Sequence, residues 1–269
     1  MSIGTANAME QAARLVSENW AAGTAMEDLP AALKPATRAE GYAAQAALER
    51  LSGRGRAGWK IAATSAAGQR HIGVEGPLAG RILGGAVLPE GTTVSLATNR
   101  MRVAEPEFAF RFGEAVPPRG EPWTVEEVLA RVASLHLAIE VPDSRFLDFA
   151  RVGGPTLIAD DACSREIVLG GAVAADWRAL ELSAHVMEGT VAGRYAREGR
   201  GANVLGDPRI ALAWCANELS GLGVGIAAGE FVTTGTCAVP LELEPGDRVR
   251  MDFGALGAVS LSVAPEGVA

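Results

Sequence analysis

The residue pattern with the clearest chemical meaning is the segment 104–112, which reads Ala-Glu-Pro-Glu-Phe-Ala-Phe-Arg-Phe. Alternate residues of a strand share one face, so Glu105, Glu107 and Arg111 are predicted to point one way and the phenylalanines the other way, into a core. Two neighbouring carboxylates repel each other unless a positive charge offsets them. Mg²⁺ and Mn²⁺ prefer oxygen ligands, so the pair is a candidate metal site. The alternative is a solvated strand face on which Arg111 is a partial counterion.

A third acid, Glu140, ends an apolar run that begins at Leu135 and is typical of a strand buried on both faces. An acid in such a place is rarely buried without a partner. Glu140 is therefore either a third carboxylate ligand or the ion-pair partner of Arg145 or another arginine. His136 lies in the same run, but no second His or Cys stands at ligand spacing, so we interpret it as a core imidazole.

Lys60 is one of only two lysines in the chain and lies in the apolar segment 57–64. A lysine, unlike an arginine, can lose its proton. Beside a cation and partly desolvated, Lys60 would have a lowered pKa and would be suited to moving protons near neutral pH. The alternative is a surface lysine whose stem lies along apolar side chains.

The rest of the pattern predicts the elements that position these side chains. Apolar residues at helical spacing predict helices in 6–51, the second of which covers 38–51 with Thr37 as its N-cap. Further helices are predicted to begin at Thr124 and at Asp207. Short β-like runs separated by Gly, Pro and Asp are predicted as strands at 104–112, 134–141, 167–173, 231–234, 248–253 and 258–263.

These elements indicate an α+β fold, with a smaller, mainly helical portion over 1–80 and a β-rich catalytic body over 81–269. The segment 53–58 matches the pattern GxGxxG, but it follows a helix and precedes the strand-like segment 59–62. A dinucleotide-binding loop has the opposite order, because it follows a strand and opens a helix. The segment therefore does not predict a dinucleotide site.

Composition excludes several classes of function. The chain has 269 residues and a formal net charge of −8, which repels phosphate backbones and argues against nucleic-acid binding. Its three cysteines are far apart without CxxC spacing, as is usual in a reducing compartment. No apolar run reaches the roughly 18 residues of a membrane helix, and the first residues lack signal-peptide features. We therefore expect a cytoplasmic protein with no membrane or nucleic-acid partner.

Taken together, these residues resemble the 2-keto-4-pentenoate hydratase and 4-oxalocrotonate decarboxylase group of the fumarylacetoacetate hydrolase superfamily. The resemblance runs from about residue 8 to residue 264. The matching blocks, in chain order, are Lys60-Ile-Ala-Ala-Thr-Ser65, Ile72-Gly-Val74 with Pro77 and Gly80, Glu105-Pro-Glu107, Ala138-Ile-Glu-Val141 with Ser144-Arg145, Ala159-Asp-Asp-Ala-Cys-Ser164, Val204-Leu-Gly-Asp-Pro208, Thr234-Gly-Thr236 and Pro245-Gly-Asp247. Their order and spacing are specific for the family but not for one reaction within it.

The resemblance implies a mixed β-sandwich or roll of the fumarylacetoacetate hydrolase C-terminal type, in a homo-oligomer. It also implies a Mg²⁺ or Mn²⁺ site formed by Glu105, Glu107 and Glu140, which would polarise a small 2-oxo acid substrate and stabilise its enolate. Lys60 matches the family lysine that moves protons. The positions that match the carboxylate end of the substrate site are Cys163, Ser164 and Thr236.

The activity that the resemblance implies is that of a lyase in aromatic-compound catabolism, namely a hydratase that converts a 2-hydroxy-2,4-dienoate to a 4-hydroxy-2-oxo acid. Leu78 departs from this pattern, because hydratases commonly carry an acid there that pairs with the lysine. An apolar residue is more typical of a 4-oxalocrotonate-type decarboxylase, which is the alternative. Asp161 replaces a usual Asn. Further alternatives are a catalytically silent partner in a complex with a sister hydratase or decarboxylase, and an acylpyruvate hydrolase, for which no His–Glu pair has adequate spacing.

Overall fold

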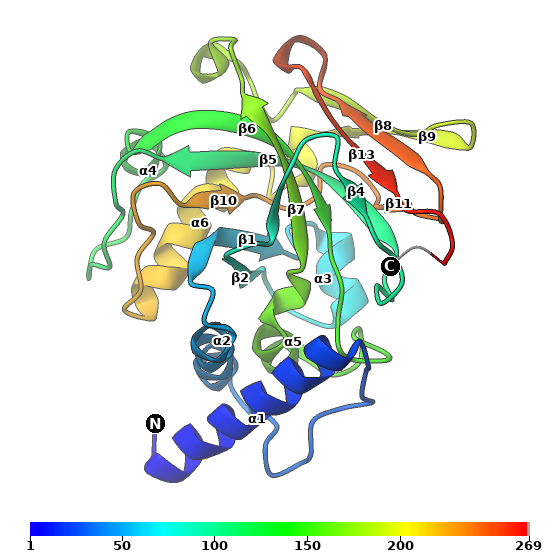
Figure 1. Cartoon of the computed structure of the whole chain (residues 1–269). Helices are drawn as coiled ribbons and strands as arrows, with labels where there is room; N and C mark the ends of the chain where they lie inside the picture. Colours follow the sequence, from blue (N-terminus) through cyan, green and yellow to red (C-terminus); the bar gives the residue numbers. More distant parts are fainter. Residues whose placement is uncertain (268–269) are drawn as a thin grey trace.

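The computed structural model describes residues 1–267, with a helical N-terminal portion lying below two β-sheets in the view of Figure 1. Its α-helices are α1 (Ile3–Ala22), α2 (Arg38–Ser52), α3 (Ala66–Ile72), α4 (Val125–Leu129), α5 (Gly154–Ala159) and α6 (Pro208–Gly221). Short 3₁₀ turns are η1 (Asp161–Cys163), η2 (Trp177–Ala179), η3 (Gly201–Asn203) and η4 (Gly254–Leu256). None of the described helices combines the length and the apolar character that a bilayer crossing requires.

Helices α1 and α2 confirm the predicted N-terminal helices, and local chemistry explains their ends. At the start of α2 the Thr37 side chain accepts a hydrogen bond from the Glu40 N–H, and the Glu40 side chain accepts one from the Thr37 N–H. Gly23 ends α1 with a φ of 65°, which glycine adopts without strain. The chain between the helices is not helical, because Pro30 and Pro35 lack the N–H that a helix interior needs.

The larger sheet has eight strands in the order β2-β1-β10-β5-β6-β7-β3, with β11 pairing onto β5. Its strands are β1 (Arg56–Ala62), β2 (Leu78–Leu83), β3 (Val87–Pro89), β5 (Val103–Phe112), β6 (Val132–Val141), β7 (Glu166–Ala172), β10 (Phe231–Thr233) and β11 (Leu241–Glu242). The pairs β1–β10 and β3–β7 are parallel, and the other pairs are antiparallel. This mixture of helices and a mixed sheet confirms the predicted α+β fold.

The smaller sheet has five strands in the order β4-β13-β12-β8-β9. They are β4 (Thr93–Val94), β8 (Val186–Val191), β9 (Tyr195–Arg200), β12 (Arg248–Asp252) and β13 (Ala258–Val263). Every β-run predicted from the sequence is a strand, and the helices predicted at Thr124 and Asp207 are α4 and α6. The β8–β9 hairpin escapes prediction because its strands contain Gly, Glu and Arg, which are weak strand formers.

The pairing register determines which side chains share a face of the larger sheet. Directly paired residues point to the same side. Lys60 pairs with Thr233, Thr233 pairs with Ala109, and Glu105 pairs with Glu140. We call the face that carries these side chains the inner face. It also holds a small apolar cluster that is separate from the main core and consists of Ile82, Ala86, Ala109, Ala138 and Ile167.

The expected boundary between two portions of the chain falls within a strand. Residue 80 lies inside β2, which pairs with β1, and β1 pairs in turn with β10. Strands from both sides of the boundary therefore share one sheet. The division into 1–80 and 81–269 stays a prediction.

Candidate metal centre

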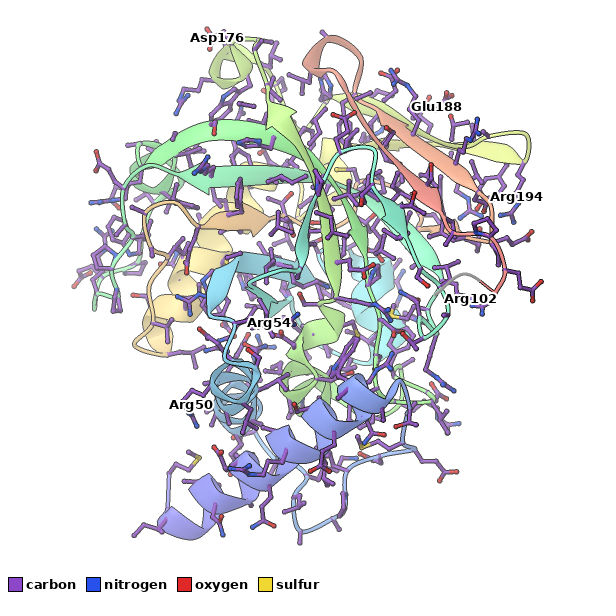
Figure 2. The ribbon with its side chains drawn as sticks, viewed as in Figure 1. Arg50, Arg54, Arg102, Asp176, Glu188 and Arg194 are labelled. Atoms are coloured by element: carbon purple, nitrogen blue, oxygen red, sulfur yellow. The ribbon has the colours of Figure 1, made fainter. Side chains whose placement is uncertain are left out.

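Charged side chains are distributed unevenly between the surface and the interior. Figure 2 shows Arg50, Asp176 and Glu188 on the outside of the molecule, where water solvates them. Glu107 and Glu140, by contrast, are only 0 % and 1 % exposed. Because a buried carboxylate is costly without a partner, these two acids require an explanation beyond ordinary packing.

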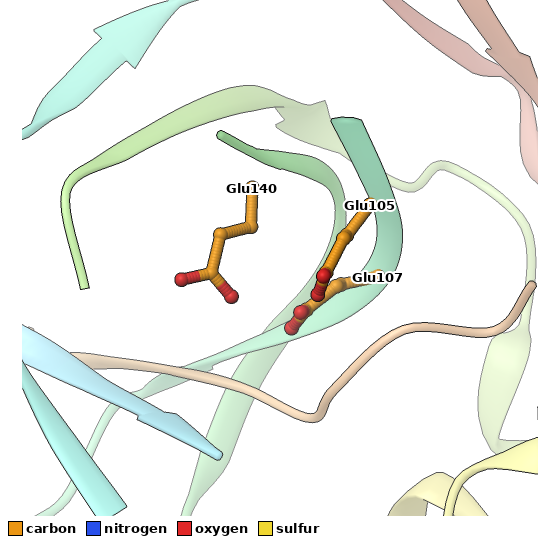
Figure 3. Close-up of side chains that lie close together, drawn as sticks. All are labelled: Glu105, Glu107 and Glu140. Carbon is orange, nitrogen blue, oxygen red and sulfur yellow. The ribbon is translucent and has the colours of Figure 1, made fainter. Parts of the chain in front are cut away.

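The two buried acids form a cluster with Glu105, as Figure 3 shows. Glu105 and Glu107 lie on one face of β5, and Glu140 lies opposite Glu105 on β6. One carboxylate oxygen from each residue lies within 4.8 Å of the others. The predicted grouping of the three acids is therefore present, while their role as ligands stays a prediction.

The charge balance of this cluster fits a divalent cation. Burial and the nearby charge of Glu140 raise the pKa of Glu105 to about 7, and burial together with both neighbouring acids raises the pKa of Glu107 well above its ordinary value. Glu107 Oε1 and both Glu140 oxygens have no hydrogen-bond partner among residues 1–267. Oxygen atoms that repel one another and lack donors suit Mg²⁺ or Mn²⁺, which take carboxylate ligands.

Lys60 is the buried cation beside this cluster. Its Nζ lies 3.0 Å from Glu140 Oε1 and donates a hydrogen bond of 2.9 Å to the Ala162 carbonyl. The contact with Glu140 is an ion pair and lacks the angles of a hydrogen bond. Burial opposes the charged form, but the charges of Glu140 and Glu105 outweigh it and raise the pKa of Lys60 above its ordinary value. The lowered pKa expected beside a bound cation stays a prediction.

A tight turn at Gly235, just after β10, provides a hydrogen-bond donor to Glu107. The Gly235 N–H donates a hydrogen bond of 2.8 Å to Glu107 Oε2. Gly235 has a φ of 94°, and a Cβ atom placed on it would lie 2.3 Å from Thr64 Oγ1. Only glycine fits at this position. Its small size lets the backbone come close enough to donate the hydrogen bond to Glu107. Thr236 follows in the same loop and donates to the Ala238 carbonyl at 2.8 Å.

The turn η1 presents the carbonyl that Lys60 contacts. Asp161, Ala162 and Cys163 all have positive φ values, of 56°, 49° and 65°. The Asp161 carboxylate accepts a hydrogen bond of 2.6 Å from the Arg81 N–H of β2. Three residues in this conformation persist only where surrounding contacts hold them.

Asp160, just before η1, receives donors from distant parts of the chain. Its carboxylate accepts hydrogen bonds from the Ser144 hydroxyl at 2.6 Å, the Arg145 N–H at 2.9 Å and the Trp20 indole N–H at 3.1 Å. Sequence reasoning does not single out Asp160, because an Asp-Asp pair is typical of a solvated loop. No local signal indicates that Trp20, 140 residues earlier, is its partner.

The residues predicted at the carboxylate end of the substrate, Cys163, Ser164 and Thr236, differ from one another in their surroundings. Cys163 is buried next to Ala162, and burial raises the pKa of its thiol. Ser164 lines a cleft of about 420 Å³ together with Trp20 and Arg81, in which none of the three glutamates takes part. The roles assigned to Cys163, Ser164 and Thr236 stay predictions.

Three other interpretations can be compared with the structure. His136 is a core imidazole whose Nδ1 and Nε2 lie 2.9 Å from the Gly170 carbonyl and the Ser134 hydroxyl, respectively. Arg145 pairs with Asp143, not with Glu140. Leu78 is fully buried on β2.

Two buried carboxylates and the half-buried Glu105, with a lysine beside them on the inner face of a mixed sheet, form a cluster typical of an enzyme that uses a divalent cation. The model of the fumarylacetoacetate hydrolase C-terminal family matches residues 83–264. The chain belongs to this family, which confirms the predicted resemblance. The expectation of Mg²⁺ or Mn²⁺ as cofactor is likewise confirmed, and the three acids form a cluster that could bind such an ion.

Relatives with known names narrow the group within this family. The chain is 31% identical to a 4-oxalocrotonate decarboxylase of Pseudomonas sp. (strain CF600), over 76% of this chain and 75% of that protein. It is 30% identical to a 2-keto-4-pentenoate hydratase of Paraburkholderia xenovorans (strain LB400), over 77% and 76%. A solved 4-oxalocrotonate decarboxylase from Pseudomonas putida G7, complexed with magnesium and adipate, matches with a TM-score of 0.86 at 25% identity, covering 95% of this chain and 97% of that chain.

Proposed function

We propose that this chain is a metal-dependent lyase of aromatic-compound catabolism that adds water to a 2-hydroxy-2,4-dienoate and gives a 4-hydroxy-2-oxo acid. The observation that carries the proposal is the cluster of Glu105, Glu107 and Glu140 with Lys60 Nζ 3.0 Å from Glu140. This arrangement combines oxygen ligands for a cation with an ammonium group beside them. The named hydratase at 30% identity supports the same reaction class.

Each of these residues has a defined task in the proposal. The three glutamates would hold Mg²⁺ or Mn²⁺, and a cation bound there supplies a Lewis acid for the carboxylate and the 2-oxygen of a short 2-oxo acid. The Lys60 ammonium has three N–H groups, of which the Ala162 carbonyl accepts one, and Glu140 is its ion-pair partner. Another N–H of Lys60 gives its proton to C5 of the dienol while the enol hydroxyl releases its own proton to solvent, which yields the 2-oxo-3-enoate to which water then adds.

The substrate carboxylate would lie toward Cys163, Ser164 and Thr236. Because burial raises the pKa of the Cys163 thiol, this residue contributes a small uncharged side chain and not a nucleophile. The proposal also includes a homo-oligomer in the cytoplasm, alone or in a complex with a sister hydratase or decarboxylase.

Decarboxylation of a 4-oxalocrotonate-type acid is the second candidate, and Leu78 favours it. Leu78 pairs with Ala62 and therefore lies on the same face as Lys60, where it adds an apolar wall and no acid. Loss of CO₂ needs an electron sink but no activated water. The decarboxylase at 31% identity supports this alternative.

A direct assay separates the two candidates. Purified protein with Mg²⁺ or Mn²⁺ is given fresh 2-hydroxypenta-2,4-dienoate or 4-oxalocrotonate, with an EDTA-treated control, and products are identified by mass. We expect metal-dependent gain of water on the dienol. Release of CO₂ from 4-oxalocrotonate without hydration of the dienol would replace the proposed activity with the second candidate, and silence on both substrates would contradict the two.

The variant Leu78→Asp tests the position that favours the second candidate. An acid at residue 78 would lie on the inner face with Lys60 and offer it a second ion-pair partner, so the ratio of hydration to decarboxylation should rise. The matched control is Leu83→Asp, at the end of the same strand and away from Lys60 in register. An unchanged ratio in Leu78→Asp would remove Leu78 as the discriminating residue.

A further inference from the structure

Thr233, the last residue of β10, carries a buried hydroxyl group that makes no hydrogen bond with the described part of the chain. Its side chain is fully buried, and its Oγ1 has no hydrogen-bond partner among residues 1–267. The adjacent Thr234 is equally buried, but its Oγ1 donates to the Phe108 carbonyl at 3.2 Å. A buried hydroxyl loses its hydration, and a bound water would compensate for this loss.

The pairing register places this hydroxyl on the inner face. Thr233 pairs with Lys60 on one side and with Ala109 on the other, so the three side chains form one row across the sheet. Glu107 precedes Ala109 by two residues and points to the same side. The hydroxyl therefore lies between the strand of the lysine and the strand of the metal-site carboxylates.

The row continues from Thr233 through Ala109 to His136, whose ring nitrogens already lie 2.9 Å from the Ser134 hydroxyl and the Gly170 carbonyl. Ala109 belongs to the apolar cluster of the inner face. A buried water needs two to four polar partners. The Thr233 hydroxyl and an N–H of Lys60 other than the one donated to Ala162 would provide two of them, and the apolar cluster limits the places where such a water can lie.

We propose that Thr233 binds the water molecule that adds to the substrate, an inference that rests on the proposed hydratase function. In this step the water oxygen bonds to C4, and the C3–C4 π pair becomes the C3–H bond. The hydrogen of that bond is the proton that the water releases. Lys60, which has already given a proton to C5, accepts the proton from water and passes it to C3, and it then regains from solvent the proton that the enol hydroxyl released.

The variant Thr233→Val keeps the shape of the side chain and removes the hydroxyl. It should slow hydration of 2-hydroxypenta-2,4-dienoate by about tenfold or more, the cost of one hydrogen bond to a reacting group. Ketonisation should continue, so the unhydrated 2-oxo-3-enoate should accumulate. Thr233→Ser should restore the hydrated product, and Mn²⁺ affinity measured by calorimetry should not change in either variant.

Thr234→Val is the matched control, because it removes a hydroxyl that already has a protein partner. It should lower the melting temperature without changing the ratio of hydrated to unhydrated product. An unchanged product ratio in Thr233→Val would overturn the water-binding role and leave the hydratase proposal standing. A wild-type protein that never hydrates the dienol would overturn both, since no water addition would remain.

A crystal structure of the Mn²⁺ form provides a readout that does not depend on turnover. We expect an ordered water within hydrogen-bond distance of Thr233 Oγ1 in the wild-type protein and no water there in Thr233→Val. A wild-type structure with no water at this hydroxyl would contradict the inference.

Discussion

On the β5–β6 ladder the candidate site is built by regular pairing, whereas at residues 160–163 it is built by departure from regular structure. Glu105 and Glu140 stand opposite each other in antiparallel register. Asp161, Ala162 and Cys163 instead adopt φ values between 49° and 65°, where each residue other than glycine costs about 1 kcal/mol or more. Strand pairing alone places the two acids of the ladder. The turn, in contrast, depends on hydrogen bonds from other elements of the chain.

The supports of the turn come from elements far away in the chain. Asp160 accepts hydrogen bonds from α1 and from the loop after β6, and Asp161 accepts one from β2. Gly80 of β2 allows the close approach, because a Cβ atom there would lie 2.3 Å from the Asp161 carbonyl oxygen. Strain at η1 is therefore offset by tertiary hydrogen bonds. In this conformation the Ala162 carbonyl accepts the hydrogen bond from Lys60.

Lys60 connects the two regions, so replacing it should have the largest effect. Lys60→Met should reduce turnover by about 10²- to 10⁴-fold, the range for loss of a proton-transfer group. Mn²⁺ affinity should stay the same or increase, because a cation that competes for Glu140 is removed. Steady-state kinetics and calorimetry measure the two quantities.

The matched control is Lys34→Met, which removes the other lysine, a partly exposed residue paired with Asp28. It should change neither quantity. A fully active Lys60→Met protein would show that the contact of Lys60 with both regions is not needed for turnover. Proton transfer would then belong to another residue.

Glu107→Gln tests the ladder alone. It should weaken Mn²⁺ binding by about 100-fold or more, since even residues that only orient metal ligands contribute roughly 10- to 100-fold. The metal-free protein should be no less stable, because one of three mutually repelling acids is gone and an oxygen remains for the Gly235 N–H. Calorimetry and urea unfolding would record these opposite effects.

Glu166→Gln is the control for this change, because Glu166 lies on the neighbouring strand β7 outside the cluster. If Glu107→Gln and Glu166→Gln lost Mn²⁺ affinity equally, the loss would come from the reduced negative charge of the protein and not from the removal of a ligand. Unchanged affinity in Glu105→Gln, Glu107→Gln and Glu140→Gln would disprove the metal site.

Asp161→Asn tests the turn and should have the smallest effect. Burial raises the pKa of Asp161 from its ordinary value of 3.8 to about 7. The folded protein thus binds this proton more tightly than the unfolded chain does. The associated stability is fully present below pH 3.8 and is lost as the pH rises through about 7.

The Asn side chain keeps an oxygen for the Arg81 N–H but has no titrating proton. Asp161→Asn should therefore gain stability relative to wild type as the pH rises from about 5 to about 8. Urea unfolding of the metal-free proteins at both pH values measures this. Asp176→Asn, on the exposed surface, should follow wild type, and parallel pH profiles for Asp161→Asn and wild type would contradict the assignment.

Much of the fold could be predicted from local signals. Capping residues predict the starts of α2, α4 and α6, and alternation predicts β5 and its two faces. The β8–β9 hairpin could not be predicted, because β8 is held by pairing with β12 and β9 by pairing with β8, and not by their own composition.

The candidate site divides in the same way. Lys60, Glu105, Glu107 and Glu140 are recognisable because a charged residue in an apolar strand is unusual wherever it occurs. Gly235 and Asp160 resemble ordinary loop residues until their contacts with Glu107 and Trp20 are known.

By itself the sequence determined which side chains share a strand face, because that follows from covalent geometry and needs no distant partner. It therefore placed Glu105 and Glu107 on one side of β5 and marked Lys60 as a candidate for proton transfer, with a surface lysine as the alternative. Only the tertiary structure decided that Glu140 stands opposite Glu105, that a strained carbonyl meets Lys60, and that the Thr233 hydroxyl is left without a partner. These facts depend on register and packing between segments far apart in the chain, which no local pattern specifies.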